Sequence, residues 1–244
     1  MFRTWHILVF FFALVVFAVA LAPARPFLRQ TEGALTYSRV EGTVWNAKVY
    51  DARVGGLDAG DVDAKVSPVD LLAGNLVVVA DLQGPEIRGR VHVGLSLGGD
   101  FELRSPAMTI SGAPLPGLGR LPGKTDIFDL VIGFADRRCR TAEGRLQSDA
   151  LVETFADPQL GPGPQLSGAA ACVGDTARLA MSGEQSDDAL QTWLDLAGDG
   201  TGQWRLGVRT QEPRRAATLI AMGLAPQGEA GAFESRGMFR WLTF

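Results

Sequence analysis

The sequence predicts a mainly β protein, in which an N-terminal transmembrane helix is followed by an antiparallel sheet with two or three short helices. Three observations lead to this prediction. A long uncharged stretch opens the chain, apolar and polar residues alternate along most of the remainder, and glycine-rich turns separate the alternating segments. We therefore expect one exported β domain behind a membrane anchor.

The first predicted element is the membrane-spanning helix. Residues 4–24 contain no charged side chain, and at ~1.5 Å per residue they would span about 31 Å, close to the hydrocarbon thickness of a bilayer. This predicts an anchor over residues 1–25 and a periplasmic domain over residues 26–244. The apolar residues on which we place the anchor are Trp5, Phe10, Phe11, Phe12, Leu14, Phe17 and Leu21.

A cleaved signal peptide is the alternative to a retained anchor. Ala22, Pro23 and Ala24 resemble a cleavage site, so a cut chain would begin at Arg25. Retention is favoured because the apolar core of a signal peptide usually runs only ~7–15 residues. Trp5 near one end of the stretch and Arg25 beyond the other also suit the two membrane interfaces.

Composition excludes one class of partner and indicates a compartment. The net charge is −4, and no run of five basic residues occurs, so the basic footprint of a nucleic-acid-binding protein is absent. Cys139 and Cys172 are the only cysteines, and both follow the anchor. An isolated pair in an exported domain predicts one structural disulfide, whereas two unconnected buried thiols would indicate a cytosolic domain.

Alternation defines the first predicted strands and helix. Trp45, Ala47 and Val49 share one face of a strand, and a second strand is expected over residues 61–66. A short helix follows, with Ser67 as N-cap, Pro68 in the first turn and Gly74 at its end.

The strongest β pattern lies in the next part of the chain. We expect strands over residues 76–82 and 87–97, and a further strand that starts at Phe101 after a glycine turn. Residues 111–124 are rich in glycine and proline, so they form either a linker between two sheet segments or a long crossover at the edge of one sheet. A division of the domain into two halves near these residues is left open.

The second half continues as strands. They are expected over residues 127–134, 139–148, 168–173 and 177–182. Residues 187–197 fit both a helix and a strand, and the turn chemistry of residues 198–202 favours the strand. Trp204, Leu206 and Val208 then alternate, and a helix over residues 213–222 follows. The tail over residues 228–244, which closes with the aromatic residues 239–244, predicts a last strand.

No residue pattern predicts an enzyme, a cofactor or a metal site. The segment from Gly94 to Gly98 matches G-x-S-x-G, the nucleophile pattern of serine hydrolases, with Ser96 as the serine. That pattern requires a helix after the serine and a later histidine as base, whereas a turn and a strand follow here and no histidine comes after Ser96. No group of histidines, cysteines and carboxylates has the spacing of metal ligands.

The chain resembles the type II secretion system protein N family. The resemblance rests on the order and spacing of the anchor and several weak motifs. These are the segment from Val40 to Ala47, the helix from Pro68 to Gly74, the stretch from Cys139 to Gly144, and Leu166-Ser167-Gly168 followed by Cys172.

This resemblance implies a single-pass protein of the bacterial inner membrane whose main domain is periplasmic. The implied role is accessory and structural, in the export of folded proteins across the outer membrane, with other inner-membrane secretion components as partners. The implied domain is similar to the AsmA-like group, in which a meander of strands forms a curved sheet or open trough. An AsmA-like lipid-binding or lipid-transfer module is the alternative function.

Overall fold

The computed structural model shows a single curved sheet that contains most of the strands. It describes residues 23–24, 35–112, 114–115, 119–120, 123–150, 152, 156, 162–185, 188–221, 223–228 and 231–241. The strand order is β1-β3-β4-β5-β6-β7-β10-β11-β12-β13-β14-β15-β17-β16, with β2 also paired to β3, and every pairing is antiparallel. The prediction of an antiparallel meander is therefore confirmed.

The first half of the sheet agrees with the predicted alternation, and the two strands predicted over residues 61–66 and 76–82 extend beyond those bounds. Its strands are β1 (Leu35–Thr36), β2 (Arg39–Thr43), β3 (Asn46–Val54), β4 (Leu57–Val66), β5 (Asn75–Gln83), β6 (Ile87–Ser96) and β7 (Phe101–Ser111). Between β4 and β5 lies α3 (Pro68–Leu72), where the Ser67 side chain accepts a hydrogen bond from the Asp70 N–H. The predicted N-cap is thus confirmed. Trp45 lies in the turn before β3 rather than on a strand face.

The second half of the sheet is also built mainly from strands at the positions where alternation predicted them. Its strands are β10 (Lys124–Ala135), β11 (Arg138–Ser148), β12 (Leu166–Val173), β13 (Thr176–Gln185), β14 (Asp188–Ala197), β15 (Thr201–Arg209), β16 (Ala225–Pro226) and β17 (Ala232–Arg240). The ambiguous segment is a strand, as the flanking turn indicated, and α4 (Pro213–Ala221) is the second described helix. The last described strand, β17, lies within the tail that was predicted to form it and ends at Arg240.

The segment rich in glycine and proline connects two neighbouring strands. β7 and β10 pair along most of their length, from Ser111 with Lys124 to Phe101 with Phe134. The connection carries a small ladder of its own, between β8 (Pro114–Leu115) and β9 (Gly119–Arg120). β7 and β10 are therefore neighbours in one continuous sheet on either side of this segment.

Two irregular positions lie side by side near the middle of the sheet. Pro106 on β7 has no N–H to donate, and β7 carries an extra residue there relative to β6. Opposite Pro106, Asp129 of β10 has a φ of 52°, and β10 carries an extra residue relative to β11. Bulges of this kind bend strands and increase their twist, so these positions favour a curved sheet over a flat one.

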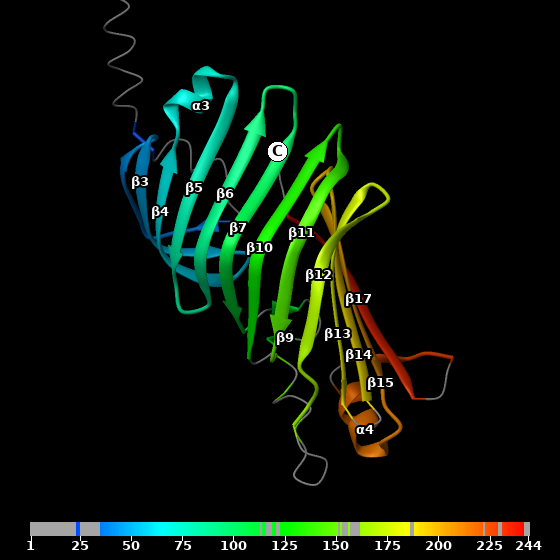
Figure 1. Ribbon diagram of the computed structural model, residues 1–244. Coiled ribbons are helices and arrows are strands. Elements are labelled where there is room, and N and C mark those ends of the chain that lie inside the picture. The colour runs from blue at the N-terminus through cyan, green and yellow to red at the C-terminus, as the bar shows by residue number, and fades with distance from the viewer. Residues whose placement is uncertain are drawn as a thin grey trace, which may run out of the picture.

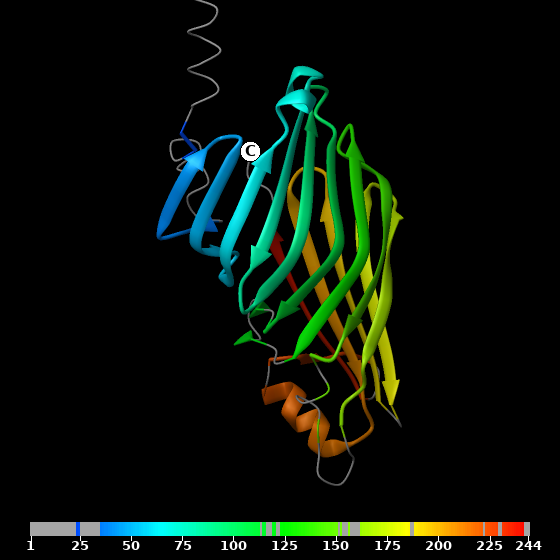
Figure 2. The ribbon, with the colours of Figure 1, turned by 60° about the vertical axis from the view of Figure 1, so that its left-hand side comes forward.

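The sheet curves until its C-terminal strands face its middle strands. Figure 1 shows β17 behind the middle strands, and the turned view of Figure 2 shows the same trough from the side of β3 and β4. Trp241 directly follows β17 and contacts both Phe101 of β7 and Phe134 of β10, with ring centroids 5.3 and 5.8 Å apart. This contact joins residues that are more than a hundred positions apart in the sequence.

The concave face holds the core. Ile132, Leu146 and Leu179 are buried on its middle strands, and Leu206 and Phe233 are buried where α4 covers one end of the trough. A smaller apolar group lies at the N-terminal end of the sheet and includes Val49 and Ile87. Met108 and Met181 each contact two of these groups, so the apolar surface continues along the whole concave face.

Candidate functional site

The concave face is less completely covered over its N-terminal strands than over the middle strands. Val66 pairs with Val78, which pairs with Val93, so these side chains form one cross-strand row. All three are only half-buried, whereas Ile132 farther along the sheet is 1% exposed. Leu76 beside this row is 37% exposed. Apolar side chains are thus available for contact at this end of the trough.

A buried ion pair fixes the opposite end of the trough. Arg215 of α4 forms a salt bridge with Asp188 at the start of β14, and the two side chains are 8% and 6% exposed. The Nε atom of Arg215 has no hydrogen-bond partner among the described residues. Because buried charges are costly unless they are paired, this contact holds α4 to the sheet. Nothing in the local sequence pattern predicted this pair.

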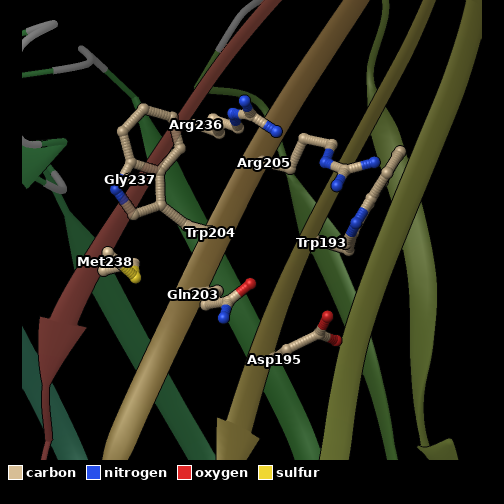
Figure 3. Close-up of a pocket in the computed structure, with 8 residues that line it drawn as sticks. All are labelled: Trp193, Asp195, Gln203, Trp204, Arg205, Arg236, Gly237 and Met238. Carbon is tan, nitrogen blue, oxygen red and sulfur yellow. The ribbon is translucent and has the colours of Figure 1, made fainter.

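The convex face carries a shallow groove over β14, β15 and β17. Its volume is about 390 Å³, and Figure 3 shows the residues that line it. The guanidinium of Arg205 lies 5.2 Å from the ring centroid of Trp193 and forms a salt bridge of 3.5 Å with Glu234. Arg236 and Met238 of β17 form the outer wall of the groove. The groove is therefore lined by two arginines, an aspartate, aromatic side chains and one exposed methionine.

Charge pairs on the convex face are hydrogen-bonded across neighbouring strands. Arg178 donates two hydrogen bonds to Asp195, which lines the groove, and these bonds raise the pKa of the Arg178 guanidinium. Arg90 donates to Asp81 at 2.6 Å and thereby lowers the pKa of that carboxyl. A lowered carboxyl pKa favours the folded state above its unfolded pKa, and this contribution is lost as the pH falls through the folded value.

The predicted disulfide is present. Cys139 of β11 is bonded to Cys172 of β12, with a Cα–Cα distance of 5.7 Å. The ladder between these strands extends only from Arg145 to Ser148 on β11, so the disulfide joins the two strands where their regular pairing has ended. The Cys139 N–H donates to the carbonyl of Asp175, which lies in the turn between β12 and β13. The disulfide therefore links β11 and β12 in a part of the sheet, called here the seam, where their backbones are not paired in a ladder.

The predicted anchor lies outside the described residues. Trp5, Phe10, Phe11, Phe12, Leu14, Phe17 and Leu21 all fall within residues 1–22. Among the residues that the structure describes, no helix has the length and apolar character needed to cross a membrane. The transmembrane helix therefore stays a prediction.

The hydrolase-like motif is part of a hairpin. Ser96 ends β6, and its side chain accepts a hydrogen bond from the Asp100 N–H in the turn that leads to β7. The strand, turn and strand predicted around this serine are confirmed. Within the described ranges, no cluster of histidine, cysteine and acidic side chains could hold a metal ion.

Comparison with known proteins places the chain in a family. The type II secretion system protein N of Vibrio cholerae serotype O1 is 32% identical to it over 138 residues, which is 52% of this chain and 52% of the relative. The chain thus spans about half the length of that curated relative. No solved structure matches it. Residues 33–234, which include nearly all of the curved sheet, match the family model described as type II secretion system (T2SS), protein N, and the protein belongs to that family.

Proposed function

We propose that the protein is an accessory component of the type II secretion system, held in the bacterial inner membrane by a single N-terminal span. The match to the protein N family over residues 33–234 carries this proposal, because it covers the sheet from β1 into β17. The role is structural, in the export of folded proteins across the outer membrane. Its partners are other inner-membrane components of the secretion system.

The disulfide supports a periplasmic location for the sheet. Structural disulfides form and persist in oxidising compartments such as the periplasm, and they are rare in the cytosol. The bond between Cys139 and Cys172 therefore fits a domain on the outer side of the inner membrane. The uncharged stretch over residues 4–24 is long enough to hold it there.

Fractionation of cells tests the anchor and the location together. We expect the native protein to begin at Met1, to stay in membranes after carbonate extraction, and to become accessible to protease only when the outer membrane is opened. We expect these results because the uncharged stretch over residues 4–24 is long enough to cross the bilayer and hold the protein in the membrane. A soluble periplasmic protein that begins at Arg25 would contradict the anchor. A domain that stays protected from protease after the outer membrane is opened would contradict the periplasmic location.

Affinity purification from membranes tests the assignment to the secretion system. We expect the tagged full-length protein to retain inner-membrane secretion components, and deletion of its gene to reduce outer-membrane transit of a secreted folded enzyme. Normal transit together with a lack of any co-purified secretion component would contradict the assignment. A single-pass inner-membrane protein of unrelated function, tagged in the same way, is the control.

A lipid-binding role is a second candidate function, supported by the incompletely covered row of Val66, Val78 and Val93. A photoreactive amino acid at Val78 would lie on the concave face, and the same group at neighbouring Val77 would lie on the convex face, where Val77 lines a shallow groove. If acyl chains occupy the trough, position 78 will crosslink phospholipid in cells and position 77 will not. Equal crosslinking at both positions, or none at position 78, would remove this candidate.

A further inference from the structure

The last long strand of the sheet is open along part of its outer edge. β17 pairs with β15 along its whole length, but on its other side β16 reaches only Phe233 and Glu234. The Trp241 N–H donates to the Gly200 carbonyl, and the Thr210 N–H donates to the Gly231 carbonyl. These two bonds show which residues of β17 direct their backbone groups toward β15. Odd-numbered residues direct their N–H and C=O groups toward β15, and even-numbered residues direct theirs away from it.

Three residues therefore present unpaired backbone groups at this edge. They are Arg236, Met238 and Arg240, and no described strand pairs with them on the side away from β15. Each has one N–H and one C=O that face outward. We call this segment, from Arg236 to Arg240, the open edge of β17. A row of unpaired groups of this kind is a template for the addition of another strand.

The side chains of the same three residues point to the convex face. Arg236 and Arg240 are exposed, and Met238 is 80% exposed. Neither arginine has an acidic partner among the described residues, whereas Arg205 on neighbouring β15 is paired with Glu234. Phe233 and Phe239, which alternate with them, pack into the core. The open edge thus offers two cations separated by one exposed apolar side chain.

These charges determine what the open edge can accept. A second copy that paired antiparallel through the same edge, centred on Met238, would place each Arg236 opposite an Arg240, and directly opposed like charges destabilise a strand pair. Carboxylates at those positions would instead form cross-strand ion pairs. The arginines therefore oppose self-association through this edge and favour an acidic partner.

We propose that the open edge of β17 binds an extended segment of a partner protein as an added β-strand, in which outward side chains alternate acidic, apolar, acidic. The backbone of the segment pairs with Arg236, Met238 and Arg240, and its two carboxylates face the two arginines. Its central apolar side chain packs beside Met238. The site follows from the edge and its charges alone, so it does not depend on the proposed role in secretion.

The test uses the full-length protein in detergent and a fluorescent peptide of sequence Ser-Glu-Thr-Val-Thr-Glu-Ser. We expect binding, measured by fluorescence anisotropy, that weakens as salt is raised, and about tenfold weaker binding of the peptide in which lysine replaces both glutamates. Binding should also slow hydrogen exchange of the Met238 amide, because that N–H faces the added strand. Failure of the acidic peptide to bind, or no preference over the lysine peptide, would overturn the proposal.

Met238→Pro tests the backbone contact separately from the charges. The Met238 N–H faces away from β15, so proline removes an edge donor and leaves the ladder with β15 intact. We expect a folded variant, with its disulfide and circular dichroism spectrum unchanged, that binds the acidic peptide about tenfold more weakly. Unchanged affinity in this folded variant would overturn strand addition.

Charge reversal tests the arginines. The Arg236→Glu/Arg240→Glu variant is expected to prefer the lysine peptide over the acidic one, because each cross-strand ion pair is re-formed with opposite signs. The matched control is Arg53→Glu/Arg88→Glu, which changes the same charge at exposed positions on β3 and β6. It should bind as the parent protein does, and an equal change of preference in this control would assign the effect to net charge and overturn the site.

Discussion

Replacement of Arg215 by methionine is expected to lower the free energy of unfolding by about 3–5 kcal/mol. The change removes the partner of Asp188, which is 5% exposed and begins a central strand of the C-terminal half. A carboxylate left buried without a partner must be protonated, or it must be hydrated by local opening of the structure. Both responses loosen the contact between α4 and the sheet. Chemical denaturation followed by circular dichroism measures the loss.

A second substitution separates loss of the ion pair from loss of packing. The Asp188→Leu/Arg215→Met double variant should recover most of the stability, because an apolar pair avoids the desolvation cost that both charges carry. Arg236→Met is the matched control, since Arg236 is exposed and its change should alter stability by no more than about 0.5 kcal/mol. A loss below about 1 kcal/mol in the Arg215→Met variant would show that the ion pair does not hold α4 in place.

Removal of the disulfide is expected to cost roughly 3–4 kcal/mol in the Cys139→Ser/Cys172→Ser variant. The bond closes a loop with a sequence separation of 33, and the chain-entropy treatment assigns this magnitude to a loop of that length. The variant should also open first along the seam between β11 and β12, because their ladder does not extend to these residues. Denaturation curves and hydrogen exchange at Cys139 and Asp175 measure the two effects.

Reduction provides the control for the disulfide. A thiol reductant should destabilise the parent protein by about the same amount as the double substitution and should leave the double variant unchanged. Two alkylatable thiols in folded protein from the periplasm would contradict the bond. That result would also remove the strongest structural support for a periplasmic location.

Much of the secondary structure could be predicted from local pattern. The period of two in residues 87–97 and 139–148 identified strands β6 and β11, and the cap at Ser67 identified α3. Strand β2 was missed because Arg39–Thr43 contains two charged residues and a glycine, so few apolar residues are left to show an alternating pattern. Trp241 looks like a strand residue in sequence, but it follows the end of β17 and its ring packs across the trough.

The side chains of the candidate sites could not be identified from the sequence. Arg215, Asp188 and the arginines of β17 are ordinary charged residues in sequence, and no local pattern distinguishes the buried pair from the exposed cations. Their environments come from contacts between segments that are distant in the chain. The groove beside Trp193 likewise requires three strands to lie side by side before its lining residues meet.

The sequence by itself therefore determined the element types, the face to which most side chains point and the pairing of the two cysteines. Alternation and capping act within a few residues, so they can be read locally. Only the tertiary structure decided the curvature of the sheet, the contact of Trp241 with Phe101 and Phe134, and the edge at which pairing stops. Curvature accumulates from the twist and bulges of many paired strands, and an edge exists only where no further strand arrives, so both depend on the whole assembled sheet.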